Sequence, residues 1–348
     1  MATIEYFTRR TCIRNLVGAL TFAIPAMSTP AAENASQRRY TGTNRTKTTG
    51  EGRAILWREP VDIAERNLYY GPGGKAHEPA GMFMFEEEDM DGSNPKFVVK
   101  DQEGIRWTVK MGSEARPETA ASRLLWAVGY AANENYFLPL LRVANLPHLH
   151  RGGNEVLNGT VRNVRLKRHN RDQQKIGTWS WSNNPFANTR ELYGLRVFMA
   201  VINNWDLKDS NNAIYQVRGD DPRLLYVVSD LGSSFGSSGL NWHAKGDLKA
   251  YSHSKFITQI SAEFVDFGVP AAPKPNTFIN FPELVRRLDL RWLGQRIPTA
   301  DARWMGDLLG RLSAEQIRDA FRAAGYLPEE IGAYTSIIEE RIVELKRL

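Results

Sequence analysis

The chain of 348 residues is 42% hydrophobic and 24% charged, which is enough apolar material for a large core or two lobes. A formal net charge of +6 is a mild excess that suits an anionic ligand such as a nucleotide. The sequence contains no stripe of Lys and Arg with interleaved aromatic residues, so a nucleic-acid partner is not expected.

Residues 1 to 32 resemble an export signal peptide, because a basic start precedes a short apolar run over 16–24 and then small residues. The run is too short to span a membrane, so no transmembrane segment is expected in the mature chain. Arg9 and Arg10 match the twin-arginine export pattern, although Cys12 stands where Phe is usual. We therefore expect an exported protein, periplasmic or secreted, with the general secretory and twin-arginine routes both open.

Residues 33 to 75 are rich in Thr, Asn, Arg and Gly and have few apolar residues in register. A segment of this composition buries little apolar surface, which indicates a linker or an N-terminal arm. The glycine cluster at 71–74 indicates a turn within it.

Residues 76 to 170 have the pattern of a small sheet with one helix. Runs rich in β-branched and aromatic residues predict strands over 97–100, 105–110, 137–143 and 161–166. Pro117 suits the first turn of a helix, and the apolar stripe that follows it predicts a helix over 117–128.

Two polar segments of this region have metal-binding residue types without the rest of a site. The acidic run 89–94 lacks the terminal Glu of a calcium loop, so a hairpin turn is the better interpretation. His148 and His150 have no Cys or third His nearby, so a zinc site is not expected there.

A predicted helix over 189–203 leads into the most informative motif of the chain, Asp206-Leu-Lys208-x-x-Asn211. In a phosphoryl-transfer site with this spacing, the Asp accepts the proton of the substrate hydroxyl. The Lys neutralises charge on the transferring phosphoryl group, and the Asn holds a metal ion. Asp206 and Lys208 are therefore the candidate catalytic residues, and Asn211 is a candidate metal ligand.

A second acidic turn, Ser229-Asp230-Leu-Gly, follows two β-rich runs over 213–217 and 224–228 that a turn-forming segment separates. A strand, a turn and a second strand bring Asp230 back toward the first motif. Asp206, Asn211 and Asp230 would then surround one site and share Mg²⁺ ions that bridge the phosphates of a nucleotide.

The C-terminal part of the chain is predicted to be helical. Ser313 and Gln316 form a capping-box pattern at the start of one helix, and Gly325 marks its end. Pro328 then opens a longer helix with an apolar side that reaches Leu345.

The ordered pair of motifs resembles the protein-kinase-like superfamily, nearer to its divergent bacterial branches, the HipA-type and lipid-kinase-like kinases, than to ordinary Ser/Thr kinases. The resemblance covers most of residues 80 to 240. It implies an α+β, bilobal protein-kinase-like fold, with a small β-rich N-lobe over 76–170 and a larger, mainly helical C-lobe over 171–348.

The same resemblance assigns the nucleotide-binding residues. Trp107-Thr-Val-Lys110 stands where kinases carry Val-Ala-Ile-Lys, so Lys110 is the expected phosphate-binding lysine, with Lys100 as a rival. A glutamate on the following helix holds such a lysine in place. Glu118 is the preferred candidate and Glu114 the alternative.

Several departures from the kinase pattern limit what the resemblance implies. Asn204 and Trp205 replace the His-Arg that usually precedes the catalytic Asp, so activation by phosphorylation is not expected. The sequence has no G-x-G-x-x-G before Lys110 and no Ala-Pro-Glu after Asp230, which leaves a peptide-docking segment in doubt. The glycine-rich and serine-rich run 232–239 is a candidate mobile cap over the site.

These observations favour an ATP- and Mg²⁺-dependent phosphotransferase that acts on a hydroxyl group of a protein, lipid or small molecule. One alternative is a kinase-fold nucleotidyl transferase, because the same lysine and metal ligands can bind a nucleotide in another orientation. The other alternative is an exported pseudokinase, a module that binds a nucleotide or a partner without catalysis.

Overall fold

The structure is a computed structural model that describes residues 50–348 except 93, 237–244 and 269–289. The expected signal peptide over 1–32 lies outside the described residues. The mixed α and β content expected from the sequence is confirmed. Within the described part, no helix is both long and apolar enough for a membrane span.

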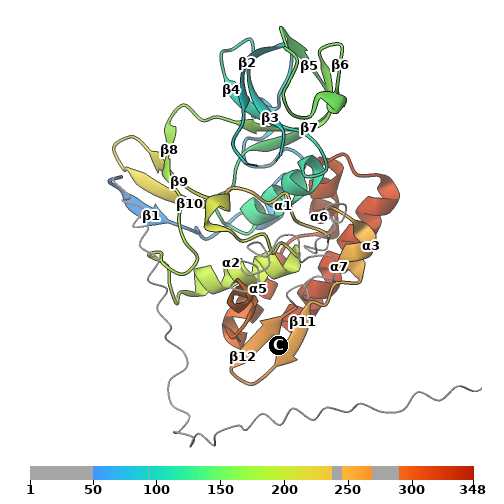
Figure 1. Cartoon of the computed structure of the whole chain (residues 1–348). Coiled ribbons are helices and arrows are strands. Elements are labelled where there is room, and N and C mark those ends of the chain that lie inside the picture. The colour runs from blue at the N-terminus through green and yellow to red at the C-terminus, as the bar shows by residue number, and fades with distance from the viewer. Residues whose placement is uncertain (1–49, 93, 237–244, 269–289) are drawn as a thin grey trace, which may run out of the picture. The chain divides into compact units, whose positions relative to one another are not determined.

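The strand-rich region at the top of Figure 1 is a six-stranded sheet in the order β4-β3-β2-β5-β7-β6. A further pairing between β4 and β7 closes five of these strands into a ring. Its strands are β2 (Phe83–Asp89), β3 (Lys96–Lys100), β4 (Arg106–Lys110), β5 (Asn135–Ala144), β6 (Val156–Leu157) and β7 (Thr160–Arg168).

The turn between β3 and β4 fixes where Lys110 falls on its strand. The Asp101 carboxylate accepts the backbone N–H of Ile105 at 2.8 Å and the Trp107 indole N–H at 2.8 Å. Trp107 and Val109 then lie in the apolar interior of the ring, since alternate residues of a strand share one face. Lys110 therefore lies on the opposite face, at the end of β4.

Helix α1 (Ala115–Ala127) packs against β5, β7 and helix α6 (Figure 1). The prediction that it starts at Pro117 was wrong by two residues. A proline is tolerated in the first turn because its missing N–H would have no intrahelical acceptor there. The helix buries Leu124 and Leu125 and ends before Gly129, whose φ of 95° favours glycine.

A second sheet lies to the left of α1 and α2 in Figure 1, in the order β1-β10-β9-β8. Its strands are β1 (Arg53–Ile55), β8 (Gln173–Gly177), β9 (Asn212–Val217) and β10 (Arg223–Val228), of which β9 and β10 form the expected hairpin. The segment 53–75 is more ordered than a linker composition indicates. Its strand β1 pairs in parallel with β10, and Leu56, Ile63 and Leu68 are buried.

Helices surround a second apolar core that is separate from the interior of the ring. They are α2 (Arg190–Val201), α3 (Leu248–Ser252), α5 (Thr299–Leu309), α6 (Ala314–Arg322) and α7 (Pro328–Lys346), with a small sheet of β11 (Ile257–Ile260), β12 (Phe264–Phe267) and β13 (Ile297–Pro298). Thr189 caps α2 through the N–H of Leu192. The Ser313–Gln316 capping box starts α6, as the sequence predicts.

Candidate active site

Lys110 is the centre of a buried cluster of charged side chains. Its Nζ lies 2.7 Å from Glu114 Oε2, 2.9 Å from Glu118 Oε2 and 3.1 Å from Asp230 Oδ1. The side chains of Lys110, Glu114 and Glu118 are at most 5% exposed, so these charges interact with little screening from water. The sequence left Glu118 and Glu114 as alternatives, and the structure brings both to the same ammonium group.

The two glutamates meet Lys110 because of where α1 begins. The backbone N–H of Glu118 donates to the Glu114 carbonyl oxygen at 3.1 Å, which places the two residues one helical turn apart on the same face. Only Met111, Gly112 and Ser113 separate Lys110 from Glu114. The strand therefore ends directly beside the first turn of the helix.

Lys100, the rival lysine, lies elsewhere. It is 48% exposed, and its ammonium group pairs with Glu86 at 3.2 Å on the outside of the sheet. Lys110, and not Lys100, is therefore the lysine that pairs with Asp230.

Asp230 reaches Lys110 from the turn that follows β10. Its Oδ1 accepts the backbone N–H of Gly232 at 3.0 Å, and the buried Leu231 anchors the turn in the apolar core. Burial by itself would raise the pKa of Asp230, but the Lys110 ammonium and the Gly232 N–H outweigh it and lower that pKa to about 2.

Gly232 is required by close packing in this turn. A Cβ at this position would lie 2.7 Å from the Cβ of Glu114 and 2.6 Å from its Oε2. The glycine therefore allows the Asp230 turn to approach the start of α1. The expected mobile cap over 232–239 is wrong in its described part, because Ser234 and Phe235 are fully buried, and residues 237–239 lie outside the described residues.

The first motif meets the second through Asn211. The Asn211 carbonyl oxygen accepts the backbone N–H of Ser229 at 2.8 Å and that of Asp230 at 3.0 Å. The Asn211 side-chain amide donates to the Asp206 carbonyl oxygen at 2.6 Å. The hairpin of β9 and β10 thus brings Asp206, Asn211 and Asp230 together, since both of its ends meet at Asn211.

Asp206 and Lys208 form an ion pair at 3.1 Å, with side chains 24% and 27% exposed respectively. The two side chains therefore stay accessible to a substrate, in contrast to the buried glutamates of the Lys110 cluster. The Asp206 backbone N–H donates to the Asn204 side chain at 3.1 Å, and Asn204 is fully buried. Asn204 therefore anchors the loop that carries Asp206.

The acidic residues keep the Lys110 ammonium charged. Burial alone would lower the pKa of Lys110, but attraction by Glu118, Asp230 and Glu114 raises it above its ordinary range. Burial would likewise raise the pKa of Glu114, but Lys110, with a smaller contribution from Lys245, keeps it below the usual value. Lys110, Glu114 and Asp230 are therefore ionised at neutral pH.

Three further residues belong to the site, and none of them was assigned to it from the sequence. Arg165 on β7 pairs with Glu118 at 3.0 Å, and Lys245 pairs with Glu114. Asn94, in the turn between β2 and β3, donates to Glu114 at 2.6 Å. Only Arg165 had a signal, because a charged residue alternates there with the apolar Val164 and Leu166 of a strand.

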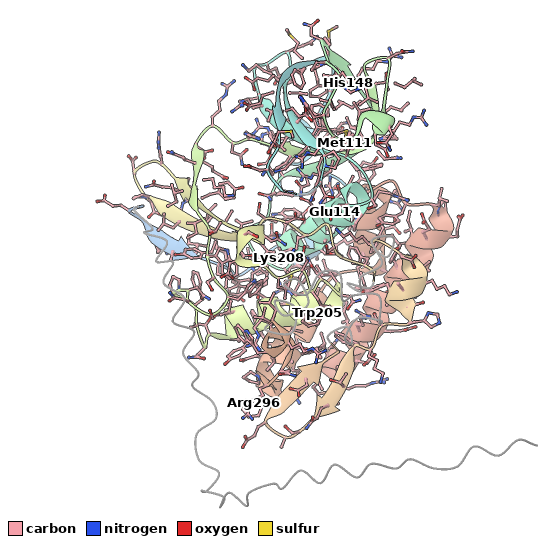
Figure 2. The ribbon with its side chains drawn as sticks, viewed as in Figure 1. Met111, Glu114, His148, Trp205, Lys208 and Arg296 are labelled. Atoms are coloured by element: carbon pink, nitrogen blue, oxygen red, sulfur yellow. The ribbon has the colours of Figure 1, made fainter. Side chains whose placement is uncertain are left out.

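The carboxylates also offer ligands for a divalent cation. Oxygen atoms of Glu114, Glu118 and Asp230 lie within 4.8 Å of one another. Asp230 is 37% exposed, whereas the two glutamates are at most 4% exposed, so Asp230 is the carboxylate that an ion can reach. His148, which the sequence did not assign to a metal site, lies well apart from Glu114 in Figure 2, toward the far end of the six-stranded sheet.

No protein-family model matches the chain, and no curated protein matches it. Among solved structures, a Helicobacter pylori proinflammatory kinase, CtkA, is similar over 77% of this chain and 98% of that chain, with 10% identity and a TM-score of 0.41. The Golgi casein kinase is similar over 76% of this chain and 75% of that chain, with 11% identity and a TM-score of 0.30. At these TM-scores the similarity by itself decides nothing about this chain.

Proposed function

We propose that the chain is a kinase-like phosphotransferase that uses Mg²⁺ and a nucleoside triphosphate, for which ATP is the donor expected from the sequence, to phosphorylate a hydroxyl group. One observation carries the proposal: a continuous series of direct contacts runs from Asp206 through Asn211, Asp230 and Lys110 to Glu118. These five residues come from two sequence motifs, a strand and a helix, and each has the chemistry that phosphoryl transfer requires at its place.

The residues divide the work between binding and chemistry. Lys110, held by Glu118, donates hydrogen bonds to nucleotide phosphates, and its raised pKa keeps it charged while it does so. Asp206 orients the acceptor hydroxyl and takes its proton as the hydroxyl oxygen attacks the γ-phosphorus and the bond to the bridging oxygen breaks. Lys208, beside Asp206, offsets negative charge on the transferring group.

The oxygen donors near Asp230 suit Mg²⁺, which prefers carboxylate and amide oxygens. The Asp230 carboxylate, partly exposed, and the Asn211 side chain would hold it. When bound, this ion neutralises charge on the phosphates and orients them. Since Lys110 already compensates the buried Glu114 and Glu118, these two glutamates serve to position the lysine.

We extend the proposal to a bilobal arrangement. Two separate apolar clusters support it, one inside the ring of strands over 83–166 and one among the helices and the second sheet. The charged site is built from both regions, because Lys110 comes from the ring and Asp230 from the second region.

The exported location expected from residues 1–32 is a further proposal. Mass spectrometry of the mature N-terminus in the native host tests it.

The first experiment measures thermal stability with ATP, with and without MgCl₂. Binding at a hundredfold excess over the dissociation constant adds about 2.7 kcal/mol to the free energy of unfolding, so a rise of several degrees in Tm is expected with both together. A Tm that responds to neither ATP nor ATP with Mg²⁺ would contradict the proposal.

Labelled ATP then separates the three functions under consideration. Transfer of the γ-label to the protein itself or to an extract of the host supports a kinase. Transfer of the α-label instead would identify a nucleotidyl transferase. Binding of ATP without transfer of either label, across protein, lipid and small-molecule acceptors, would identify a non-catalytic module.

A further inference from the structure

Lys167 lies on the face of the strand ring that carries Lys110, and the proposed chemistry does not use it. In the pairing of β4 with β7, Lys110 is opposite Arg165 and Thr108 is opposite Lys167. Residues directly opposite one another, and residues two apart on one strand, share a face of the sheet. The pair between Arg165 and Glu118 shows that this face looks toward α1 and the site.

Among the residues that the structure describes, the Lys167 ammonium has no acceptor. The side chain is only partly exposed, and within the described part of the chain it makes no hydrogen bond or ion pair. Burial, together with the neighbouring Arg165, lowers the pKa of Lys167 to about 8. An ammonium that has lost much of its water without gaining a partner binds an acceptor supplied by a ligand more strongly than an exposed lysine does.

The residues around Lys167 make this part of the face polar. Thr108 Oγ1 and His169 Nε2 form a hydrogen bond at 2.7 Å. Burial and the charge of Lys167 lower the pKa of His169 to about 4, so the imidazole is neutral at neutral pH. A nucleotide that lies here therefore meets hydrogen-bonding groups and one cation instead of an apolar wall.

The position of Lys167 relative to Lys110 indicates which part of a nucleotide it meets. Because β4 ends at Lys110, a nucleotide with its phosphates at Lys110 and Asp230 that stays against this face of the ring has its base farther back along β4 and β7. Thr108 and Lys167 are two residues, roughly 6–7 Å, beyond Lys110 and Arg165 on these strands. On this face Lys110 pairs with three carboxylates and Arg165 with Glu118, whereas Lys167 pairs with none of the described residues and can meet the distal part of the ligand.

We propose that Lys167 contacts the base of the bound nucleotide and selects guanine over adenine. The inference rests on the proposed function, since it assumes that a nucleotide binds with its phosphates at Lys110. Guanine presents two acceptors, O6 and N7, on one edge, and lysine is a common partner of that edge. Adenine carries an amino group in place of O6, which points hydrogens toward the cation and weakens its binding.

The test compares affinities for the Mg²⁺ complexes of ATP, GTP and ITP by calorimetry on the full chain. The wild type should bind GTP about tenfold more tightly than ATP, the discrimination typical of one well-placed base contact. ITP keeps O6 and lacks the 2-amino group, so it should behave like GTP. Lys167→Met should remove the preference, and Lys167→Arg, which retains a donor, should keep most of it. Lys175→Met, at an exposed position of β8, is the matched control.

Other outcomes separate this inference from the proposed function. Equal affinities for ATP and GTP in the wild type, or an equal loss of both in Lys167→Met, would overturn the base contact and leave the phosphotransferase proposal standing. Failure of all three nucleotides to bind the folded wild type would overturn the proposed function and the inference together. Thermal unfolding of each variant checks that the fold is retained.

Discussion

The carbonyl oxygen of Asn211 accepts the backbone N–H of Asp230 at 3.0 Å. This hydrogen bond joins the two ends of the β9–β10 hairpin, where the first motif ends and the second begins. The 18 intervening residues form the hairpin and hold these ends at a fixed separation. Asp206 and Asp230 thus keep their relative positions without any contact between their side chains. A rigid support of this kind is what a metal-dependent transfer site requires.

Replacing Asp230 by Asn should abolish the Mg²⁺ dependence of nucleotide binding while leaving the fold nearly unchanged. The amide is isosteric and still accepts the Gly232 N–H, but it loses the charge that an ion requires. Calorimetric titration with ATP, with and without Mg²⁺, measures the effect. Asp220→Asn, in the exposed turn of the same hairpin, is the control. Unchanged affinity and unchanged Mg²⁺ dependence in Asp230→Asn would refute Asp230 as a metal ligand.

Replacing Lys110 by Met should weaken nucleotide binding and also destabilise the ligand-free protein. Removal of one partner from a buried ion pair typically costs about 3–5 kcal/mol, because it leaves charges without compensation. Here Asp230 loses its cation, while Glu114 and Glu118 each lose one of two cations and keep Lys245 and Arg165 respectively. Lys100→Met, which breaks an exposed pair with Glu86, should cost about 0–1 kcal/mol and leave nucleotide affinity intact.

Denaturant unfolding of both lysine variants checks this expectation. If Lys100→Met lost nucleotide affinity and Lys110→Met retained it, the two lysines would have been assigned the wrong way round.

Stability should fall as the pH drops below about 4, in the absence of nucleotide. The pKa of Asp230 is about 2 in the folded protein, below the value near 3.9 of an unfolded chain. A carboxyl group with a lowered pKa contributes stability above the unfolded value, and this contribution is lost as pH falls through the folded value. The pKa of Glu114 is lowered as well, so it acts in the same direction.

Chemical unfolding at intervals between pH 7 and pH 2 measures this loss. In Lys110→Met, Asp230 and Glu114 lose the Lys110 ammonium that stabilises their charged forms. The difference in free energy of unfolding between the variant and the wild type should therefore narrow at low pH. A constant difference in free energy of unfolding over the whole pH range would show that the carboxylates are not coupled to Lys110.

The local elements were largely predictable from the sequence, because their signals lie within a few residues. The Ser313–Gln316 capping box and the β9–β10 hairpin depend on contacts between near neighbours, and both were expected. The pairing of β1 with β10 was missed, since about 170 residues separate Arg53 from Arg223 and no local pattern specifies a distant parallel partner.

The candidate site shows the same division between local and distant contacts. Spacing alone places Glu114 and Glu118 on one face of a helix, yet it cannot decide which of them reaches Lys110, because that depends on where the helix starts. The contact of Asn94 with Glu114 depends on where the turn between β2 and β3 lies relative to the start of α1, and the contact of Arg165 with Glu118 depends on how α1 packs against β7. Tertiary packing decides these contacts, and the local patterns of a single sequence do not specify how distant segments pack.

Replacing Gly232 by Ala should destabilise the protein and weaken nucleotide binding. Gly232 has no left-handed backbone that would itself forbid alanine, so the effect comes from crowding of the Glu114 side chain. Displacing this side chain disturbs its contact with Lys110, and overpacking of this kind typically costs about 1–3 kcal/mol.

Gly177→Ala is the matched control for Gly232→Ala. No heavy atom lies within 4 Å of the Cβ that it adds, so its effect should stay within about 0.5 kcal/mol. Thermal unfolding and ATP titration of both variants make the comparison. Equal stability of the two alanine variants would show that Glu114 yields without cost.

Replacing Asp206 by Ala should reduce turnover about a hundredfold or more, the usual scale for loss of a positioned general base. Nucleotide affinity should survive, because the Asp206 carboxylate pairs with Lys208 and takes no part in the Lys110 cluster. Asp209→Asn is the control, since the amide oxygen can still accept the backbone N–H of Trp181 as the carboxylate does. Initial rates of label transfer from γ-labelled ATP, together with calorimetric affinities, separate the loss of chemistry from the loss of binding. Equal transfer rates in the wild type and Asp206→Ala would remove Asp206 from the chemistry. A parallel loss of affinity would instead assign it to nucleotide binding.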